Sequence, residues 1–217
     1  FFTVLTSLGA KERLALSFRH MKDDPQNHIR VIPPLLRREV TLHEPYSGDY
    51  IHGYMVNAGF SENVMKWHRQ HPRIPLRFFW DKWEEEPVKR VDNTLSFYQL
   101  DDVEFLRQMA GCKAYASTAG FESVCEAMYL GKPILMVPAH IEQDCNAYDA
   151  EKSGAGIISS DFNLQQLLEF AKDYHPNRDF VYWVRGAGYT LLNLLESDSS
   201  NYQQVLFNEM YLVEEFI

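Results

Sequence analysis

The polar residues between Ser117 and Ala147 have the types and spacing of a ligand site. This stretch reads STAGFESVCEAMYLGKPILMVPAHIEQDCNA. Gly120 allows the backbone to approach a ligand closely. The free N–H groups and positive end of a helix beginning near Phe121 can bind a diphosphate without Lys or Arg. Packing explains the apolar residues of the stretch, whereas its polar residues predict binding of a small anionic ligand.

The hydroxyls and carboxylates of the same stretch suit a nucleotide sugar. Glu126 follows Ser123 by almost one helical turn on the same face, where its carboxylate can accept hydrogen bonds from both hydroxyls of a ribose. Residues 117–118 add two hydroxyl donors. Residues 142–143, in the loop after the next strand, could bracket the hydroxyls of a sugar.

Alternating strands and helices must position these residues. We predict strands at 50–57, 74–80, 94–100, 113–118, 133–138 and 156–159, and helices at 62–71, 101–111, 122–131, 143–154, 163–174 and 178–196. This order predicts an α/β fold with a Rossmann-like parallel sheet and helices on both faces. Such sheets bind ligands at the carboxyl ends of their strands, near a reversal in strand order. The charged segment 81–93 is interpreted as a solvated connection.

The two ends of the chain have a different pattern. We predict a helix over residues 11–21, and an extended connector around Pro33 and Pro34, which disfavour a helix. The chain opens on an apolar run without Met, so we expect a fragment of a longer protein. The family resemblance described below implies that residues 1–48 are the tail of an otherwise missing N-terminal domain plus an interdomain connector. It also implies that residues 49–198 are the nucleotide-sugar-binding domain, and we expect a C-terminal helix at residues 199–217.

Composition narrows the class of protein. The chain has 217 residues and a net charge of −9, which argues against a general nucleic-acid binder. Three cysteines indicate a reducing compartment, and apolar runs are far shorter than the ~20 residues of a membrane span. We therefore expect a cytoplasmic protein, with peripheral attachment to the inner membrane face left open. No zinc-like spacing and no Asp-x-Asp pair is present, so no metal is expected.

The motif resembles the donor site of nucleotide-sugar glycosyltransferases with the GT-B fold, in the UDP-glycosyltransferase and MurG-like group. Their pattern THxGxxSxxEAxxxGxPxxxxPxxxDQxxNA is matched with identical spacing at Gly120, Ser123, Glu126, Ala127, Gly131, Pro133, Pro138, Gln143, Asn146 and Ala147. The resemblance implies the C-terminal, donor-binding half of such an enzyme. It also implies that Gly120 and Ser123 contact the diphosphate, Glu126 the ribose, and Glu142 and Gln143 the transferred sugar.

Two departures from the pattern bear on the donor. Thr118 stands where many members have a phosphate-binding His, and Phe121 and Glu122 replace a frequent Trp-Asn pair. Outside the motif, the resemblance places a phosphate-facing loop after the first strand, the base near the third strand, and an interdomain connector at IPPLLRREV. The predicted donor-binding residues are Gly59, Ser61, Gln99, Ser117, Thr118, Gly120, Ser123, Glu126, Glu142, Gln143 and Asn146.

For some of these residues, a purely structural role is the alternative to ligand binding. Ser61 could be only a helix N-cap, and Asn146 could only cap and pack its helix. His52 is interpreted as a hydrogen-bonded core residue, and His140 as an exposed loop histidine in preference to a catalytic base. No catalytic residue is assigned within this chain.

The predicted function is transfer of a hexosyl or N-acetylhexosaminyl group from a nucleotide-diphospho-sugar, expected to be UDP-linked, without metal or other cofactor. The acceptor is a glycan, as in cell-envelope polysaccharides, a lipid-linked glycan or a small molecule. Its base is expected on the missing domain or on a partner subunit, so the chain alone should be inactive. Three alternatives stay open: a GT-B-fold sugar-nucleotide epimerase, a non-catalytic donor-binding subunit of a two-chain transferase, and a Rossmann-like binder of another nucleotide. The segment AHIEQDCNA lacks the basic Arg-Thr-Glu-Arg-Pro-Glu-like sequence of the epimerases, which favours transfer.

Overall fold

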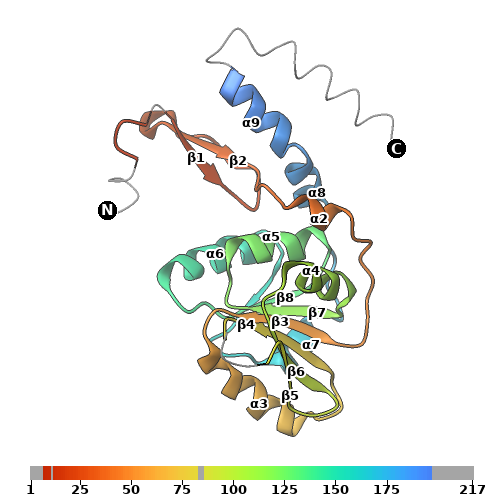
Figure 1. Ribbon diagram of the computed structural model, residues 1–217. Coiled ribbons are helices and arrows are strands. Elements are labelled where there is room, and N and C mark those ends of the chain that lie inside the picture. The colour runs from red at the N-terminus through yellow and green to blue at the C-terminus, as the bar shows by residue number, and fades with distance from the viewer. Residues whose placement is uncertain (1–6, 11, 83–85, 197–217) are drawn as a thin grey trace. The chain divides into compact units, whose positions relative to one another are not determined.

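The computed structural model describes residues 7–10, 12–82 and 86–196 (Figure 1). Two compact units divide the chain. One is Leu36–Val181, and the other combines Phe1–Leu35 with Tyr182–Ile217. The predicted C-terminal helix at 199–217 lies outside the described residues.

A seven-stranded sheet forms the centre of the unit Leu36–Val181. Its order is β5-β6-β4-β3-β7-β8-β9, and each neighbouring pair is parallel except β5 with β6. The six parallel strands, numbered along the chain, therefore lie in the order 3-2-1-4-5-6, and this order reverses between β3 and β7. The strands are β3 Ile51–Met55, β4 Leu76–Trp80, β5 Val88–Arg90, β6 Leu95–Gln99, β7 Ala114–Ser117, β8 Ile134–Met136 and β9 Gly156–Ile158. The predicted α/β fold is confirmed.

Helices cover both faces of the sheet, as Figure 1 shows. Helices α4, α5 and α6 lie on one face, whereas α3 and α7 pack on the other. Their bounds are α3 Ser61–Gln70, α4 Asp102–Gly111, α5 Phe121–Tyr129, α6 Ile141–Lys152 and α7 Leu164–Phe170, with the short α2 Arg38–Thr41 and the 3-10 helix η2 Ala58–Phe60 before them.

Alternation along the strands divides the core into two layers. On the α3 and α7 face, strand residues such as Phe78 and Phe97 pack with Val64 and Leu167. The opposite face carries an aromatic cluster in which His52, Tyr54, Phe79 and Tyr115 pack around Phe105 of α4 or against each other. Because both faces are covered, the strands are apolar in nearly continuous runs.

Strand β5 corrects the interpretation of residues 81–93 as a connection. Val88–Arg90 pairs antiparallel with β6 at the edge of the sheet. Edge strands commonly carry charged side chains, and this one is only half-buried to exposed. Its lysine and arginine therefore gave it the pattern of a solvated loop.

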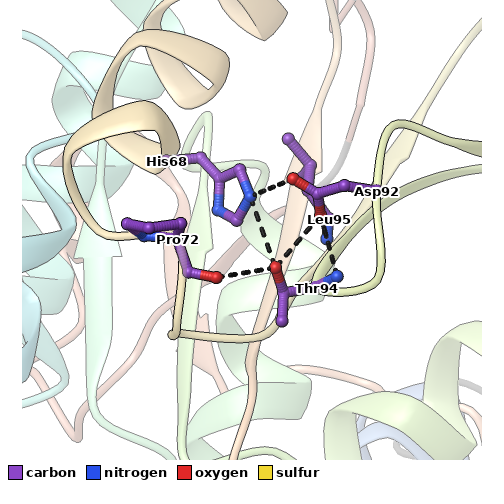
Figure 2. Close-up of polar contacts among 5 residues, drawn as sticks. All are labelled: His68, Pro72, Asp92, Thr94 and Leu95. Carbon is purple, nitrogen blue, oxygen red and sulfur yellow. Dashed lines mark hydrogen bonds and ion pairs between the residues drawn. The ribbon is translucent and has the colours of Figure 1, made fainter.

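A hydrogen-bonded turn ties the β5–β6 hairpin to the end of α3 (Figure 2). The Asp92 carboxylate accepts from the N–H groups of Thr94 and Leu95, both at 2.8 Å, and lies 2.8 Å from His68 Nε2. The Thr94 hydroxyl donates to the Pro72 carbonyl at 2.8 Å. These bonds, that from the Thr94 N–H foremost, hold the pKa of Asp92 well below its usual range. The cluster is structural and lies at the opposite end of the strands from the predicted ligand site.

The second unit overturns one prediction. Residues 13–16, expected within a helix over 11–21, form strand β1 Arg13–Leu16, which pairs in parallel with β2 Ile29–Ile32. The side chains of β1 alternate between half-buried and exposed, a period of two that the helix-favouring residues of KERLALS concealed. The same unit holds η1 Pro25–Asn27, α9 Ala187–Glu196 and the part of α8 Arg178–Arg185 that begins at Tyr182. The indole N–H of Trp183 donates to the Ser17 carbonyl at 3.0 Å.

Candidate functional site

A pocket of about 610 Å³ opens at the carboxyl ends of β3, β6 and β7 in the unit Leu36–Val181. This is the place where the strand order reverses and where doubly wound sheets bind their ligands. Its lining residues are Arg37, Tyr54, Leu100, Asp102, Phe105, Gly120, Phe121, Glu122, Ser123, Glu126 and Glu142. The motif predicted from the sequence therefore borders a cavity large enough for a small molecule.

The first turn of α5 forms one wall of the pocket. Gly120 is its N-cap, and no side chain caps the helix, in contrast to α4, where Asp101 accepts from the Glu104 N–H at 2.8 Å. The Ser123 hydroxyl donates to the Gly120 carbonyl at 3.1 Å. The positive end of α5 is thus directed into the cavity without a side-chain acceptor.

Three predicted ligand residues support the loop before α5. The loop passes through Ala119, a fully buried residue with φ of 60°, which is uncommon without glycine. The Ala119 N–H donates to Ser117 Oγ at 3.1 Å, and its carbonyl accepts from Asn146 Nδ2 at 3.4 Å. Thr118 Oγ1 accepts from the Val56 N–H at 3.3 Å. These side chains hold a strained backbone that places Gly120 at the cavity.

Glu126 is paired with an arginine from a distant part of the chain. Arg37 Nε lies 2.6 Å from Glu126 Oε1, and Arg37 Nη2 lies 2.9 Å from Oε2. The third nitrogen, Nη1, lies 3.1 Å from Asp102 Oδ1. The hydrogen bond with Glu126, opposed in part by burial, raises the pKa of Arg37. This is the bidentate geometry in which arginine binds carboxylates most strongly.

The pocket carries more negative than positive charge. Asp102, Glu122, Glu126 and Glu142 line it, and Arg37 is the one basic side chain among the described residues that do so. An anionic ligand in this pocket therefore depends on the N-terminus of α5 and on Arg37.

The remaining predicted residues lie around the pocket or away from it. Glu142, in the first turn of α6, lines the cavity. Gln143 is buried, and its Oε1 accepts from the Ala139 N–H at 2.8 Å. Gly59, Ser61 and Gln99 are not among the lining residues. Ser61 begins α3, and the preceding turn is capped by the Asn57 side chain, which accepts from the Gly59 N–H.

Two histidines with predicted roles, His140 and His52, lie in different surroundings. His140 is exposed and precedes α6 as its N-cap residue. His52 is a buried core residue, as expected. Within the described part of the chain neither ring nitrogen has a partner within ordinary distance and angle limits, and the Arg77 backbone, which slightly opposes the lowering of the His52 pKa by burial, is a weak partner.

Sequence reasoning missed seven lining residues: Arg37, Tyr54, Leu100, Asp102, Phe105, Phe121 and Glu122. Three of them could have been found from their position at the carboxyl end of a predicted strand. Leu100 and Asp102 follow β6, and Tyr54 lies near the end of β3. Arg37 precedes Glu126 by 89 residues, and local spacing gives no sign that the two meet.

The described residues hold no group of three or more His, Cys, Asp or Glu side chains arranged to bind a metal ion. Within the same ranges, every helix is too short or too polar to span a bilayer.

Comparisons with known proteins agree with this architecture. The family model of glycosyl transferase family 1 matches residues 9–174. The UDP-glucuronosyltransferase-like protein ugt-48 of Caenorhabditis elegans is 26% identical over 105 residues, which is 48% of this chain and 20% of that protein.

Solved structures of similar fold include two glycosyltransferases. The kitacinnamycin glycosyltransferase has a TM-score of 0.62 and 15% identity over 86% of this chain and 54% of its own. The calicheamicin glycosyltransferase CalG4 has a TM-score of 0.57 and 14% identity over 78% of this chain and 48% of its own. At these identities the likeness establishes the fold. The chain spans about half the length of both solved proteins.

Proposed function

Because the chain belongs to glycosyl transferase family 1, we propose that its unit Leu36–Val181 binds the nucleotide-diphospho-sugar donor of a sugar-transfer reaction. The observation that carries this proposal is the pocket at the strand-order reversal, with the uncapped N-terminus of α5 and Glu126 in its wall. A helix N-terminus attracts a diphosphate, and a carboxylate beyond it on the same helix can accept the hydroxyls of the ribose.

The proposed chemistry uses no metal ion. The departing nucleoside diphosphate gains charge as the glycosidic bond to it breaks. The N–H groups and dipole of α5, already oriented before the reaction, stabilise that charge. Glu142 lines the same pocket from α6 and is proposed to contact the transferred sugar, a hexosyl or N-acetylhexosaminyl group.

We propose a UDP-linked donor. The similar protein of Caenorhabditis elegans is named for UDP-glucuronosyl transfer, and the motif from Gly120 to Ala147 resembles that of UDP-glycosyltransferases. The acceptor and the base that activates it are proposed to depend on a further domain or a partner subunit. The length of the solved glycosyltransferases, about twice the matched span, supports this division.

Titration of the chain with UDP, GDP, CDP and dTDP tests the proposal, with isothermal calorimetry and NMR as readouts. We expect saturable binding of UDP and weaker binding of the others. The isosteric substitution Glu126→Gln should weaken UDP binding roughly tenfold or more, because a hydrogen bond to a charged group is lost.

The matched control is Glu169→Gln, on α7 at a residue outside the pocket lining. It removes the same charge and also breaks an ion pair, to Lys172 at 2.6 Å. If the two variants bind UDP equally, the pocket is not the donor site. If the parent and both variants bind none of the four nucleotides, the proposed donor role of this chain is wrong.

A further inference from the structure

The carboxylate proposed to receive the ribose is already occupied within the protein. Both oxygens of Glu126 accept hydrogen bonds from Arg37, at 2.6 and 2.9 Å. The Glu126 side chain is only 3% exposed, whereas that of Arg37, which also lines the pocket, is 36% exposed. A ribose that enters the pocket therefore meets the guanidinium before it meets the carboxylate.

The same guanidinium has a natural second partner in the proposed ligand. It is the one basic group among the described lining residues, in a pocket with four carboxylates. Planar guanidinium groups bind phosphate as readily as carboxylate, in the same bidentate geometry. A diphosphate brings the stronger negative charge to the solvent-exposed side of Arg37.

We propose that Arg37 exchanges partners when the donor binds. In the empty pocket it covers Glu126. In the loaded pocket it binds the diphosphate, which frees the oxygens of Glu126 for the ribose hydroxyls. This inference rests on the proposed donor-binding function and adds a specificity device to it. A ligand with ribose but no phosphate has to displace Arg37 without compensation, so the pocket selects nucleoside diphosphates over nucleosides.

Asp102 gives the released guanidinium a second anchor. It accepts from Arg37 Nη1 at 3.1 Å, and its own side chain is 79% exposed at the start of α4. Its carboxylate can follow the guanidinium by rotation about its side-chain bonds, because little packs against it. Arg37 can therefore turn from Glu126 toward the cavity while one of its ion pairs is maintained.

The test compares uridine with UDP on the full chain and on Arg37→Gln, which keeps a hydrogen-bond donor but loses the charge. Calorimetry gives both dissociation constants. Exchange predicts opposite signs: uridine binds more tightly to the variant because its competitor is gone, and UDP binds more weakly because its counter-charge is gone. We expect the ratio of the uridine to the UDP dissociation constant to fall roughly tenfold or more.

Arg38→Gln is the matched control. Arg38 is the next residue, is exposed and does not line the pocket, so its substitution removes the same charge from the same segment. It should leave the ratio unchanged. The double variant Arg37→Gln/Glu126→Gln removes both charges of the pair and guards against poor folding of the single variant. It should discriminate between uridine and UDP as little as a folded Arg37→Gln does.

The outcomes separate this inference from the proposed function. If UDP binds the parent chain but Arg37→Gln weakens uridine and UDP by equal factors, Arg37 only orients Glu126 and the exchange is wrong. An unchanged ratio in Arg37→Gln, or in the double variant when the single variant does not fold, also overturns it. If UDP binds none of these proteins, the donor-binding role fails and the exchange falls with it.

Discussion

His52 makes the stability of the fold depend on pH in a way that one substitution should remove. Its ring lies on β3 among Phe79, Phe105 and Tyr115, with ring centroids 4.8 to 5.3 Å away, and it is 0% exposed. Burial, with a smaller effect from the positive charge of Arg77, lowers the pKa of His52 from 6.5 to about 3. The native state therefore holds this imidazole neutral between pH 7 and pH 5.

The sign and size of the effect follow from proton linkage. Between pH 6.5 and pH 3 the unfolded chain binds a proton at His52 that the folded chain does not. Stability is therefore lost as the pH falls through this window. With these two pKa values the free energy of unfolding falls by about 2 kcal/mol between pH 7 and pH 5, approaching about 1.4 kcal/mol per pH unit at the lower end.

Urea unfolding at pH 7, 6 and 5, followed by circular dichroism, measures this contribution as a difference between variants. In His52→Leu the imidazole is absent, so its pH dependence should be weaker than that of the parent by the same ~2 kcal/mol. The control His175→Leu replaces an exposed imidazole and should keep the pH dependence of the parent. Parallel profiles for His52→Leu and the parent would refute the argument, because they would mean that His52 is protonated or solvated in the folded state.

Two further predictions concern the hairpin and the thiols. Asp92→Ala should lower the free energy of unfolding by about 1–3 kcal/mol, because it removes Oδ1, which accepts from the N–H groups of both Thr94 and Leu95. Asp92→Asn keeps an oxygen at this position and should cost less in the same urea experiment. A thiol reagent should modify the exposed Cys145 rapidly in the folded chain, and the buried Cys112 and Cys125 only after denaturation. Burial raises the pKa of Cys112 to about 12, and the thiolate is the reactive form. Fast labelling of more than one thiol in the folded chain would contradict this prediction.

The sheet could be predicted because its signal is local. Short apolar segments such as 133–138, separated by helices of ordinary length, leave little choice but a parallel sheet covered on both faces. The sequence prediction missed two strands, and the reasons are also local. β5 carries the charges of an edge strand, and β1 is built from residues that also favour helices. Their strand character comes from their pairing with β6 and β2, which their own residues do not reveal.

The site was predictable only where its residues are close in sequence. Gly120 is the N-cap of α5, and Ser123 and Glu126 follow it within the first two turns, so their spacing shows that they share a wall of the pocket. The partner of Glu126 is 89 residues away. Its position depends on how the chain runs from residue 37 into β3, and no periodicity encodes that path. The one basic side chain among the described lining residues could therefore not be assigned to the pocket from the sequence.

The motif combines residues that face the cavity with residues that hold the backbone in place. Of the eleven predicted donor-binding residues, four line the pocket: Gly120, Ser123, Glu126 and Glu142. Ser117 and Asn146 form hydrogen bonds with the backbone of Ala119, and Thr118 accepts from the N–H of Val56, which follows β3. This explains why threonine is tolerated at 118 in a loop of this shape: its hydroxyl accepts from the Val56 N–H and fixes the loop. A threonine also brings no positive charge, so the proposed diphosphate would have no basic partner at this position. Arg37 is the one basic side chain among the described lining residues, and under the proposed exchange it would supply that positive charge.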